Sequence, residues 1–347
     1  MSSESTIFSF NKMENVNNRV DFLDGYRGTL ALWVFIHHCN YFAKLEGDYS
    51  FFHFTGYYIG VVGFFILSSY LLTYRLLKEM DKSNCLKGDI IIFIKYGIRR
   101  FFRIYIPFVF MCGLIKYVSH EIGGPFSWSS CSWYHLVTLK DAAGSQLWTI
   151  APEIKYYFFL PVYVYLSHKM NKSVYLKITG LIINVMFLFT VEYLGLINEF
   201  DKDGNYRRPP HELLTRFTTF YLGSFLAVII FNVQELELYK NISKQNAGKL
   251  GFGNLLAILS TLMYVYGMKL FSMKLNPSLK SGKHFFLSGL YWSIFMLMFI
   301  LSKENFFTRF FNGTFLHYCG KFSFGIYLLH TATFIQITMK KLNLNSK

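Results

Sequence analysis

Two basic side chains in the first long apolar segment have the types and spacing of a reaction site. Arg27 and His38 stand eleven positions apart. In an α-helix, eleven residues make three turns plus roughly 20°, so the two side chains share one face. Ionisable side chains within a membrane helix are costly and by default functional. Because neutral imidazole titrates near working pH, His38 is a candidate general base.

A structural interpretation of His38 stays open beside the catalytic one. A histidine in an apolar helix can simply hydrogen-bond a neighbouring helix. His37 lies about 80° from the face that His38 shares with Arg27, so we expect it to meet another helix or an interfacial water.

Further charged residues stand at the edges of other apolar segments. Arg100 and Arg103 are three positions apart, so they can face one oxyanion together; plain interfacial anchoring is the alternative. Glu153 is expected at the outer membrane edge, facing the other helices. Glu153 could orient the acceptor or pair with an arginine from another helix; the structural alternative is an ion pair with Lys155 or Arg216.

These residues require membrane helices to position them. Hydrophobic residues make up 53% of the 347 residues and charged residues only 16%, against about 25% charged in soluble domains. In hydrocarbon, apolar runs of roughly 20 residues must be helical. We therefore predict an all-α, polytopic transmembrane bundle. It has about nine helices, at residues 22–43, 51–74, 101–118, 146–167, 178–197, 213–233, 250–271, 285–301 and 322–339.

One domain is expected, over residues 21–340, between a polar N-terminal tail (1–20) and a polar C-terminal tail (341–347). The net charge of +15 does not favour nucleic-acid binding, because the basic residues are scattered over loops. Eight of them lie in the segment Arg75–Arg103. By the positive-inside rule this segment and the N-terminus are cytosolic, in a multi-pass membrane protein whose organelle stays open.

Other polar residues support fewer conclusions. The cysteines are dispersed without metal-ligand spacing, so no metal site is predicted. Ser68 and Ser69 are expected to serve tight helix packing. Ser323, Tyr327 and His330 form one stripe that either lines a polar path or bonds neighbouring helices.

Several stretches, in order along the chain, resemble the acyltransferase 3 family of membrane acyltransferases. LDGYRG at Leu23–Gly28, with His38 after Arg27, is similar to the family's opening LDGxRG helix and its essential histidine. Residues 60–72 resemble its GVDxFFVLSGFLI motif, with Val62 and Ser69 as departures. Four further stretches resemble the motifs RRxxRIxP, WTLSVEExFYLxxP, RxxxFxxG and LGxxSYxxYLxH, at residues 99–107, 148–161, 216–223 and 320–330.

The resemblance implies a reaction and a set of roles. The donor substrate would be an acyl-coenzyme A, whose phosphates Arg100 and Arg103 would hold. His38 would act as base, Arg27 would tune or position it, and Glu153 would help at the acceptor side. Family members usually carry one more helix after the stretch that ends at His330, whereas residues 331–347 end in a polar tail, so we expect that helix to be absent.

The leading hypothesis is O-acyl transfer, most simply of acetyl, from acyl-CoA to a hydroxyl of a carbohydrate, lipid or small metabolite. The expected partners are the lipid bilayer, the donor and this acceptor. Two alternatives are a transporter of a lipid or metabolite, since intramembrane His, Arg and Glu also build substrate pathways, and a non-catalytic relative that keeps the scaffold. The oligomeric state is not predicted.

Overall fold

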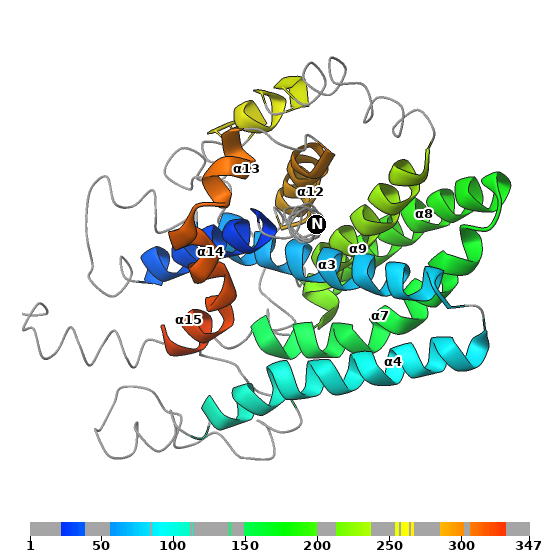
Figure 1. Cartoon of the computed structure of the whole chain (residues 1–347), viewed down its shortest axis with the longest axis horizontal. Coiled ribbons are helices and arrows are strands. Elements are labelled where there is room, and N and C mark those ends of the chain that lie inside the picture. The colour runs from blue at the N-terminus through cyan, green and yellow to red at the C-terminus, as the bar shows by residue number, and fades with distance from the viewer. Residues whose placement is uncertain are drawn as a thin grey trace, which may run out of the picture.

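The protein is a bundle of helices, as the computed structural model in Figure 1 shows. The residues that the structure describes are almost all helical, and none of them forms a strand, which confirms the predicted all-α class. They are residues 22–38, 56–83, 85–111, 113, 139, 149–199, 213–236, 254–256, 258–263, 265–266, 285–301 and 306–330.

The first described helix covers residues 22–38, and a π-helical turn, Gly56–Val61, leads into α3. A second π-helical turn, Phe101–Tyr105, follows α4 and continues as helix through residue 111. The labelled helices are α3 (Val62–Asp81), α4 (Leu86–Arg100), α7 (Ile150–Met170), α8 (Val174–Glu199), α9 (Leu213–Glu235), α12 (Phe285–Leu301), α13 (Phe306–Phe311), α14 (Thr314–Lys321) and α15 (Ser323–Leu329).

Three of the described helical stretches are long and apolar enough to cross a membrane: Ile59–Asp81, Val174–Leu194 and Arg216–Glu235. Phe286–Leu301 is apolar but shorter. The predicted span 322–339 is described only through His330. The expected absence of a later helix concerns residues outside the described part, and the number of nine spans stays a prediction.

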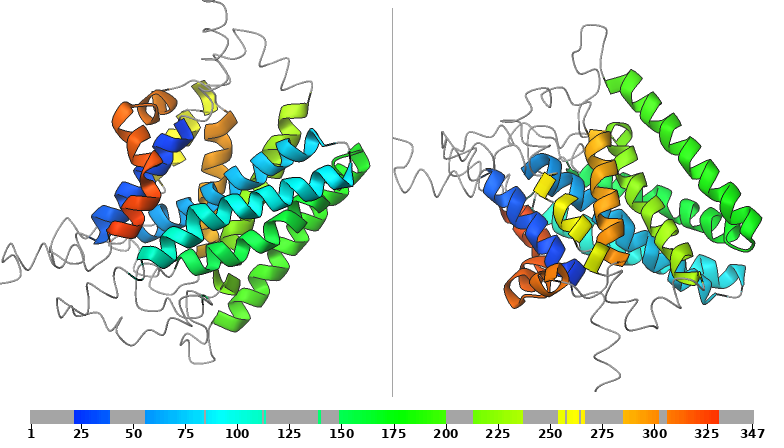
Figure 2. Two further views of the ribbon diagram at one scale, coloured as in Figure 1. Left: turned by 60° about the horizontal axis from the view of Figure 1, so that its bottom comes forward. Right: turned by 90° about the horizontal axis from the view of Figure 1, so that it is seen from above.

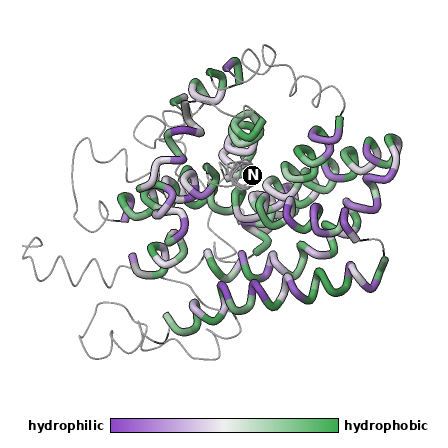
Figure 3. The backbone as a smooth tube through the Cα atoms, in the orientation of Figure 1, coloured by the Kyte–Doolittle hydropathy of each residue, from purple (hydrophilic) through white to green (hydrophobic). Residues whose placement is uncertain are grey.

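The helix α8 lies at the outside of the bundle, as the side and top views of Figure 2 show. Only 17% of its most apolar window is buried against protein, compared with 72% for the stretch that contains α3. Figure 3 shows that most of α8 is hydrophobic. A helix that is apolar on its outward side needs a nonaqueous environment there. The surface of α8 is therefore suited to lipid.

The basic segment Arg75–Arg103 is a helical hairpin rather than an irregular loop between two spans. The helix α3 runs to Asp81, and α4 starts at Leu86. Glu79 neutralises part of this charge, because Arg75 donates to its carboxylate over 2.8 Å and Arg99 over 3.0 Å. The latter contact joins the two helices. Basic residues of this segment therefore lie within helices, whereas their density in the sequence indicated only the side of the membrane.

One end of the bundle gathers several helix termini. The Tyr74 hydroxyl near the end of α3 donates to Gln234 Oε1 near the end of α9, over 2.5 Å. Lys177 near the start of α8 pairs with Glu235 over 2.6 Å. These ends therefore lie on the same side of the bundle, as the predicted alternation of spans requires.

The helices α3 and α9 pack closely where they cross. There is no room for a side chain at Gly223, because an added Cβ would overlap the Ile66 carbonyl oxygen and the Ser69 hydroxyl. Ser69 itself donates to the Phe65 carbonyl over 2.8 Å. Small residues permit such close approach of membrane helices, so the packing interpretation of Ser69 agrees with its contacts.

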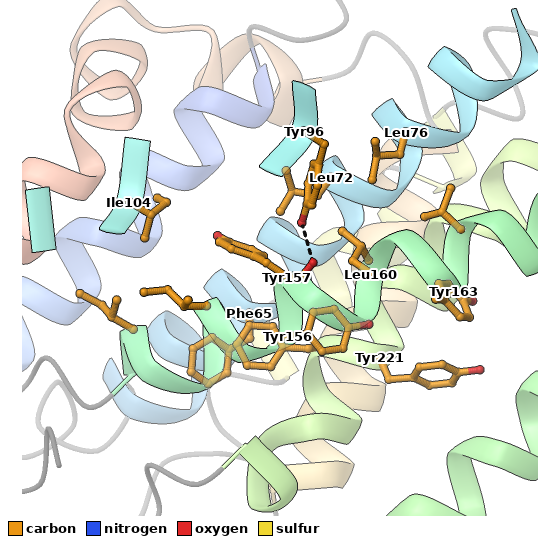
Figure 4. Packing of buried hydrophobic residues seen from close by; sticks show 14 of the residues in the cluster. Phe65, Leu72, Leu76, Tyr96, Ile104, Tyr156, Tyr157, Leu160, Tyr163 and Tyr221 are labelled. Carbon is orange, nitrogen blue, oxygen red and sulfur yellow. Dashed lines mark hydrogen bonds between the residues drawn. The ribbon is translucent and has the colours of Figure 1, made fainter. Parts of the chain in front are cut away.

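Hydroxyl groups fix α7 against this pair of helices. Ser224 on α9 accepts hydrogen bonds from Tyr156 over 2.8 Å and from Thr73 over 2.9 Å. The Tyr156 ring also stacks on Phe220 at a centroid distance of 5.1 Å. Figure 4 shows Tyr156 within this cluster, together with Tyr157 and Tyr96. These contacts determine which side of α7 faces α3 and α4.

Helix 22–38 packs against the C-terminal helices through glycines of the LDGYRG stretch. A Cβ on Gly25 would overlap the carbonyl of Phe311, and one on Gly28 would overlap the carbonyl of Leu316. Gly320 is equally close to the carbonyl of Asp24. In Figures 1 and 2 helix 22–38 (blue) lies beside α14 and α15 (red). The glycines thus place the helix of Arg27 and His38 directly on these elements.

We expect Gly223→Ala to destabilise the protein by roughly 1–3 kcal/mol, because the added methyl group overpacks the crossing of α3 and α9. Gly97→Ala on α4 is the matched control, since an added Cβ there meets nothing within 4 Å. Thermal unfolding of the detergent-purified protein measures both. An unfolding midpoint for Gly223→Ala equal to that of Gly97→Ala would contradict the tight crossing.

Candidate functional site

His38 is held in a defined orientation near the end of helix 22–38. Its Nδ1 lies 2.8 Å from the carbonyl oxygen of Val34. A carbonyl can only accept, so Nδ1 carries the proton, and in the neutral ring the lone pair resides on Nε2. The side chain is half-buried. This tautomer is the one that a base acting through Nε2 requires.

A second histidine faces His38 from α15. The ring centroids of His38 and His330 are 4.8 Å apart, with an interplanar angle of 63°. His37 contacts the His38 ring from the other side at 4.9 Å. Of the predicted stripe on α15, His330 therefore meets helix 22–38, while the Tyr327 hydroxyl and Thr149 Oγ1 share a hydrogen bond of 2.5 Å.

Arg27 does not contact His38, although the two share a face. Eleven residues along a helix separate them by roughly 16 Å. Arg27 donates to Asp24 over 3.1 Å and interacts electrostatically with Arg103 and Glu153. The expectation that Arg27 positions His38 therefore has no direct contact to support it, because sharing a face does not imply being neighbours.

Glu153 lies among arginines from two other helices. Its carboxylate accepts a hydrogen bond from Tyr157 over 2.5 Å and another from Ser68, and it interacts electrostatically with Arg100 and Arg27. The structure thus brings Arg27, Arg100 and Glu153 into one group. We call these three residues, together with Arg103, the arginine cluster. Of the alternatives considered from sequence, these contacts favour pairing of Glu153 with arginines from other helices over an ion pair with Lys155 or Arg216.

Arg100 and Arg103 were expected at the cytosolic membrane edge and Glu153 at the outer edge, and these positions relative to a membrane stay predictions. Arg100 is the last residue of α4, a helix that begins at Leu86. Glu153 nevertheless interacts electrostatically with Arg100, so these two side chains do not stand at opposite ends of the bundle.

The three arginines of the RRFFR stretch have separate environments. Arg99 is bound to Glu79. Arg100 is half-buried, and its Nε has no hydrogen-bond partner among the described residues. Arg103 is exposed. Arg100 is the last residue of α4, whereas Arg103 lies within the π-helical turn Phe101–Tyr105, so the two do not keep the spacing of an ordinary α-helix.

Tyrosines support this cluster from α4 and α7. Tyr96 donates to the carbonyl of Tyr157 over 3.5 Å, as the dashed line in Figure 4 shows. Burial raises the pKa of Tyr96 against the opposing effect of Arg100, so the hydroxyl stays protonated and able to donate. This contact joins the helix that carries Arg100 to the helix that carries Glu153.

Sequence reasoning did not identify the roles of Tyr157, Ser68 and Thr149. Ser68 was assigned to packing, but it bonds Glu153. The only signal for Tyr157 was its position four residues after Glu153, which places both on one helix face. Thr149 had no signal, since its partner Tyr327 is far along the chain. Val62, where the family motif has Asp, is fully buried in the apolar core.

The described residues include no group of three side chains suited to hold a metal ion. The described site offers imidazoles, guanidinium groups, hydroxyls and the half-buried carboxylate of Glu153. Guanidinium groups bind phosphates and other oxyanions. An imidazole with its lone pair on Nε2 can take a proton from a hydroxyl.

We expect Glu153→Gln to destabilise the protein by roughly 1–3 kcal/mol, because the half-buried Arg27 and Arg100 lose the carboxylate that balances their charge. Lys155→Gln is the matched control two residues away on the same helix. The unfolding midpoint in detergent distinguishes them. Equal midpoints for the two variants would show that Glu153 does not balance the arginine charges.

Comparison with known proteins relates this site to a family. Residues 20–346 match the family described as an acyltransferase domain. The peptidoglycan O-acetyltransferase OatA of Listeria monocytogenes is 25% identical over 333 residues, which cover 89% of this chain and 48% of that protein.

A second relative is similar to the same extent. The O-acetyltransferase OatA of Staphylococcus aureus is 24% identical over 327 residues, which cover 89% of this chain and 49% of that protein. The chain thus spans about half the length of the curated relatives it matches. No solved structure matches the chain. With helices able to span a bilayer and a family match over nearly its whole length, this integral membrane protein belongs to the acyltransferase 3 family.

Proposed function

We propose that the protein transfers an acyl group, most simply acetyl, from acyl-coenzyme A to a hydroxyl of an acceptor. The observation that carries the proposal is the pairing of two sites in one bundle: an arginine cluster suited to phosphates, and an imidazole with its base nitrogen directed away from its own helix. The acceptor is a carbohydrate, lipid or small metabolite. The name of the Listeria relative favours a carbohydrate.

The arginine cluster would hold the donor. Arg103 is exposed, and the buried Nε of Arg100 lacks a hydrogen-bond partner among the described residues. A phosphate group would supply the missing acceptor, with charge-assisted hydrogen bonds. Arg27 adds positive charge to the same group, and Glu153 keeps the arginines in place when no donor is bound. In this proposal Glu153 acts on the donor side, and a role of Glu153 in binding the acceptor requires a separate test.

The acyl transfer itself would occur at His38. Its Nε2 takes the proton of the acceptor hydroxyl while the hydroxyl oxygen attacks the thioester carbonyl. The C–O bond forms, the C–S bond breaks, and the proton is delivered to the leaving sulfur. The extended pantetheine arm of coenzyme A would bridge the separation between the arginine cluster and His38. The N-terminus is cytosolic in this arrangement, since the basic end of the bundle faces inward.

Replacement of His38 by Ala should lower acyl transfer by roughly 10²- to 10⁴-fold, because that is the contribution of general-base catalysis. Mass spectrometry of glycans and lipids from cells with and without the protein measures the acyl mass shift and identifies the acceptor. His317→Ala on α14 is the control, with equal expression and unfolding midpoint required. Full transfer by His38→Ala would refute the proposed function.

Replacement of Arg100 or Arg103 by Ala should weaken the binding of acetyl-CoA by about 10- to 100-fold, since a charge-assisted hydrogen bond is worth ~1.5–3 kcal/mol. Calorimetry with the purified protein measures the affinity. Acetyl-pantetheine, which lacks the nucleotide phosphates, should bind the variants and the parent equally. Arg309→Ala, at an exposed arginine of α13, is the control. An equal loss for both ligands would contradict phosphate binding.

A further inference from the structure

The rings of His38 and His330 are anchored in the same way on different helices. His38 Nδ1 donates to the Val34 carbonyl over 2.8 Å. His330 Nδ1 donates to the carbonyls of Tyr327, over 2.5 Å, and Ile326. In both rings the proton is therefore on Nδ1 and the lone pair of the neutral form is on Nε2. Each Nε2 lies at the ring edge remote from the anchoring carbonyl.

The Nε2 of His330 is a buried acceptor that the fold leaves unused. The side chain is only 4% exposed, and Nε2 has no hydrogen-bond partner among the described residues. Buried polar atoms are nearly always satisfied, so an exception calls for a functional explanation. The ring of His38 lies against that of His330, with centroids 4.8 Å apart.

The surroundings hold the His330 ring in place. The Tyr327 ring contacts it at 5.2 Å, and the Tyr327 hydroxyl is tied to Thr149 at the start of α7. Gly28 and Gly320 allow helix 22–38 and α14 to approach closely just before α15 begins. The position of His330 relative to His38 is therefore determined by contacts on both helices and not by the two rings alone.

We propose that His330 is a positioning residue for His38, and this inference rests on the proposed function. When the acceptor hydroxyl gives its proton to His38 Nε2, the new N–H donates to His330 Nε2. The imidazolium charge is then shared by two rings within the bundle, where an isolated charge is costly. The same proton leaves for the coenzyme A sulfur as the C–S bond breaks, so both rings end neutral and no further reactant is needed.

Asn and Gln, the two amino acids with amide side chains, provide a matched pair of substitutions for His330. Gln at position 330 can place its Oε1 near the site of Nε2, whereas Asn at that position reproduces only the Nδ1 side of the ring. We expect His330→Asn to lower the rate of acetyl transfer by about 10- to 100-fold, and His330→Gln to recover at least half of the parent rate. The affinity for acetyl-CoA should change less than twofold in either variant.

The measurement follows labelled acetyl from acetyl-CoA into the acceptor fraction, in membranes of cells that express each variant at equal level. The loss in the double variant His38→Ala with His330→Asn should be no larger than in His38→Ala alone, because the two residues act as a unit. If His38→Ala is inactive but His330→Asn keeps the parent rate, the inference on His330 fails and the proposed function stands. If His38→Ala stays active, the proposed function fails.

A packing role for His330 would give a different pattern. The variants His330→Asn and His330→Gln would then lose rate in parallel with their unfolding midpoints, and His330→Phe, which fills the same space, would keep the parent rate. We expect His330→Phe to lose as much rate as His330→Asn, with a midpoint close to that of the parent. Retained activity in His330→Phe would overturn the proposal.

Discussion

A carboxylate inside an apolar helical bundle is the constraint on which this structure depends. An unpaired charge costs too much in such surroundings, so Glu153 requires positive charge and hydrogen-bond donors around it. Arg27 comes from helix 22–38, Arg100 from α4, and Ser68 from α3. Four helices, including α7 itself, must therefore be in register for this one half-buried charge to be tolerated. In the proposed function the same arrangement holds the guanidinium groups that bind the donor phosphates.

The sequence predicted the helical class, and it singled out the polar residues of the candidate site because a charged or imidazole side chain in an apolar run is conspicuous; their roles stay predictions. His38, Arg27, Glu153 and Arg100 were all recognised in this way. Their grouping was not predictable from periodicity, since a 3.6-residue repeat defines the face of one helix but not which helix lies opposite. The contact of His38 with a histidine from the last described helix is a case of this kind.

Charge density left the local structure of one region open. The segment Arg75–Arg103 was recognised by its basic residues and assigned to the cytosolic side, and the structure shows that it folds as two helices. Glu79 joins these helices by binding Arg99 across the hairpin. Glu79 is one of three acidic residues in the segment, with Asp81 and Asp89, and the sequence did not indicate which arginine it binds.

The π-helical turn Phe101–Tyr105 inserts the equivalent of one extra residue into an otherwise continuous helix. The part before it, with Tyr96 facing α7, and the part after it, with buried Phe108, consequently have independent rotational settings. A shortening of this turn by one residue would rotate the whole of α4 relative to residues 106–111. The side chains of Arg99 and Arg100 would then face different neighbours, so the pairing of Arg99 with Glu79 depends on the length of this turn.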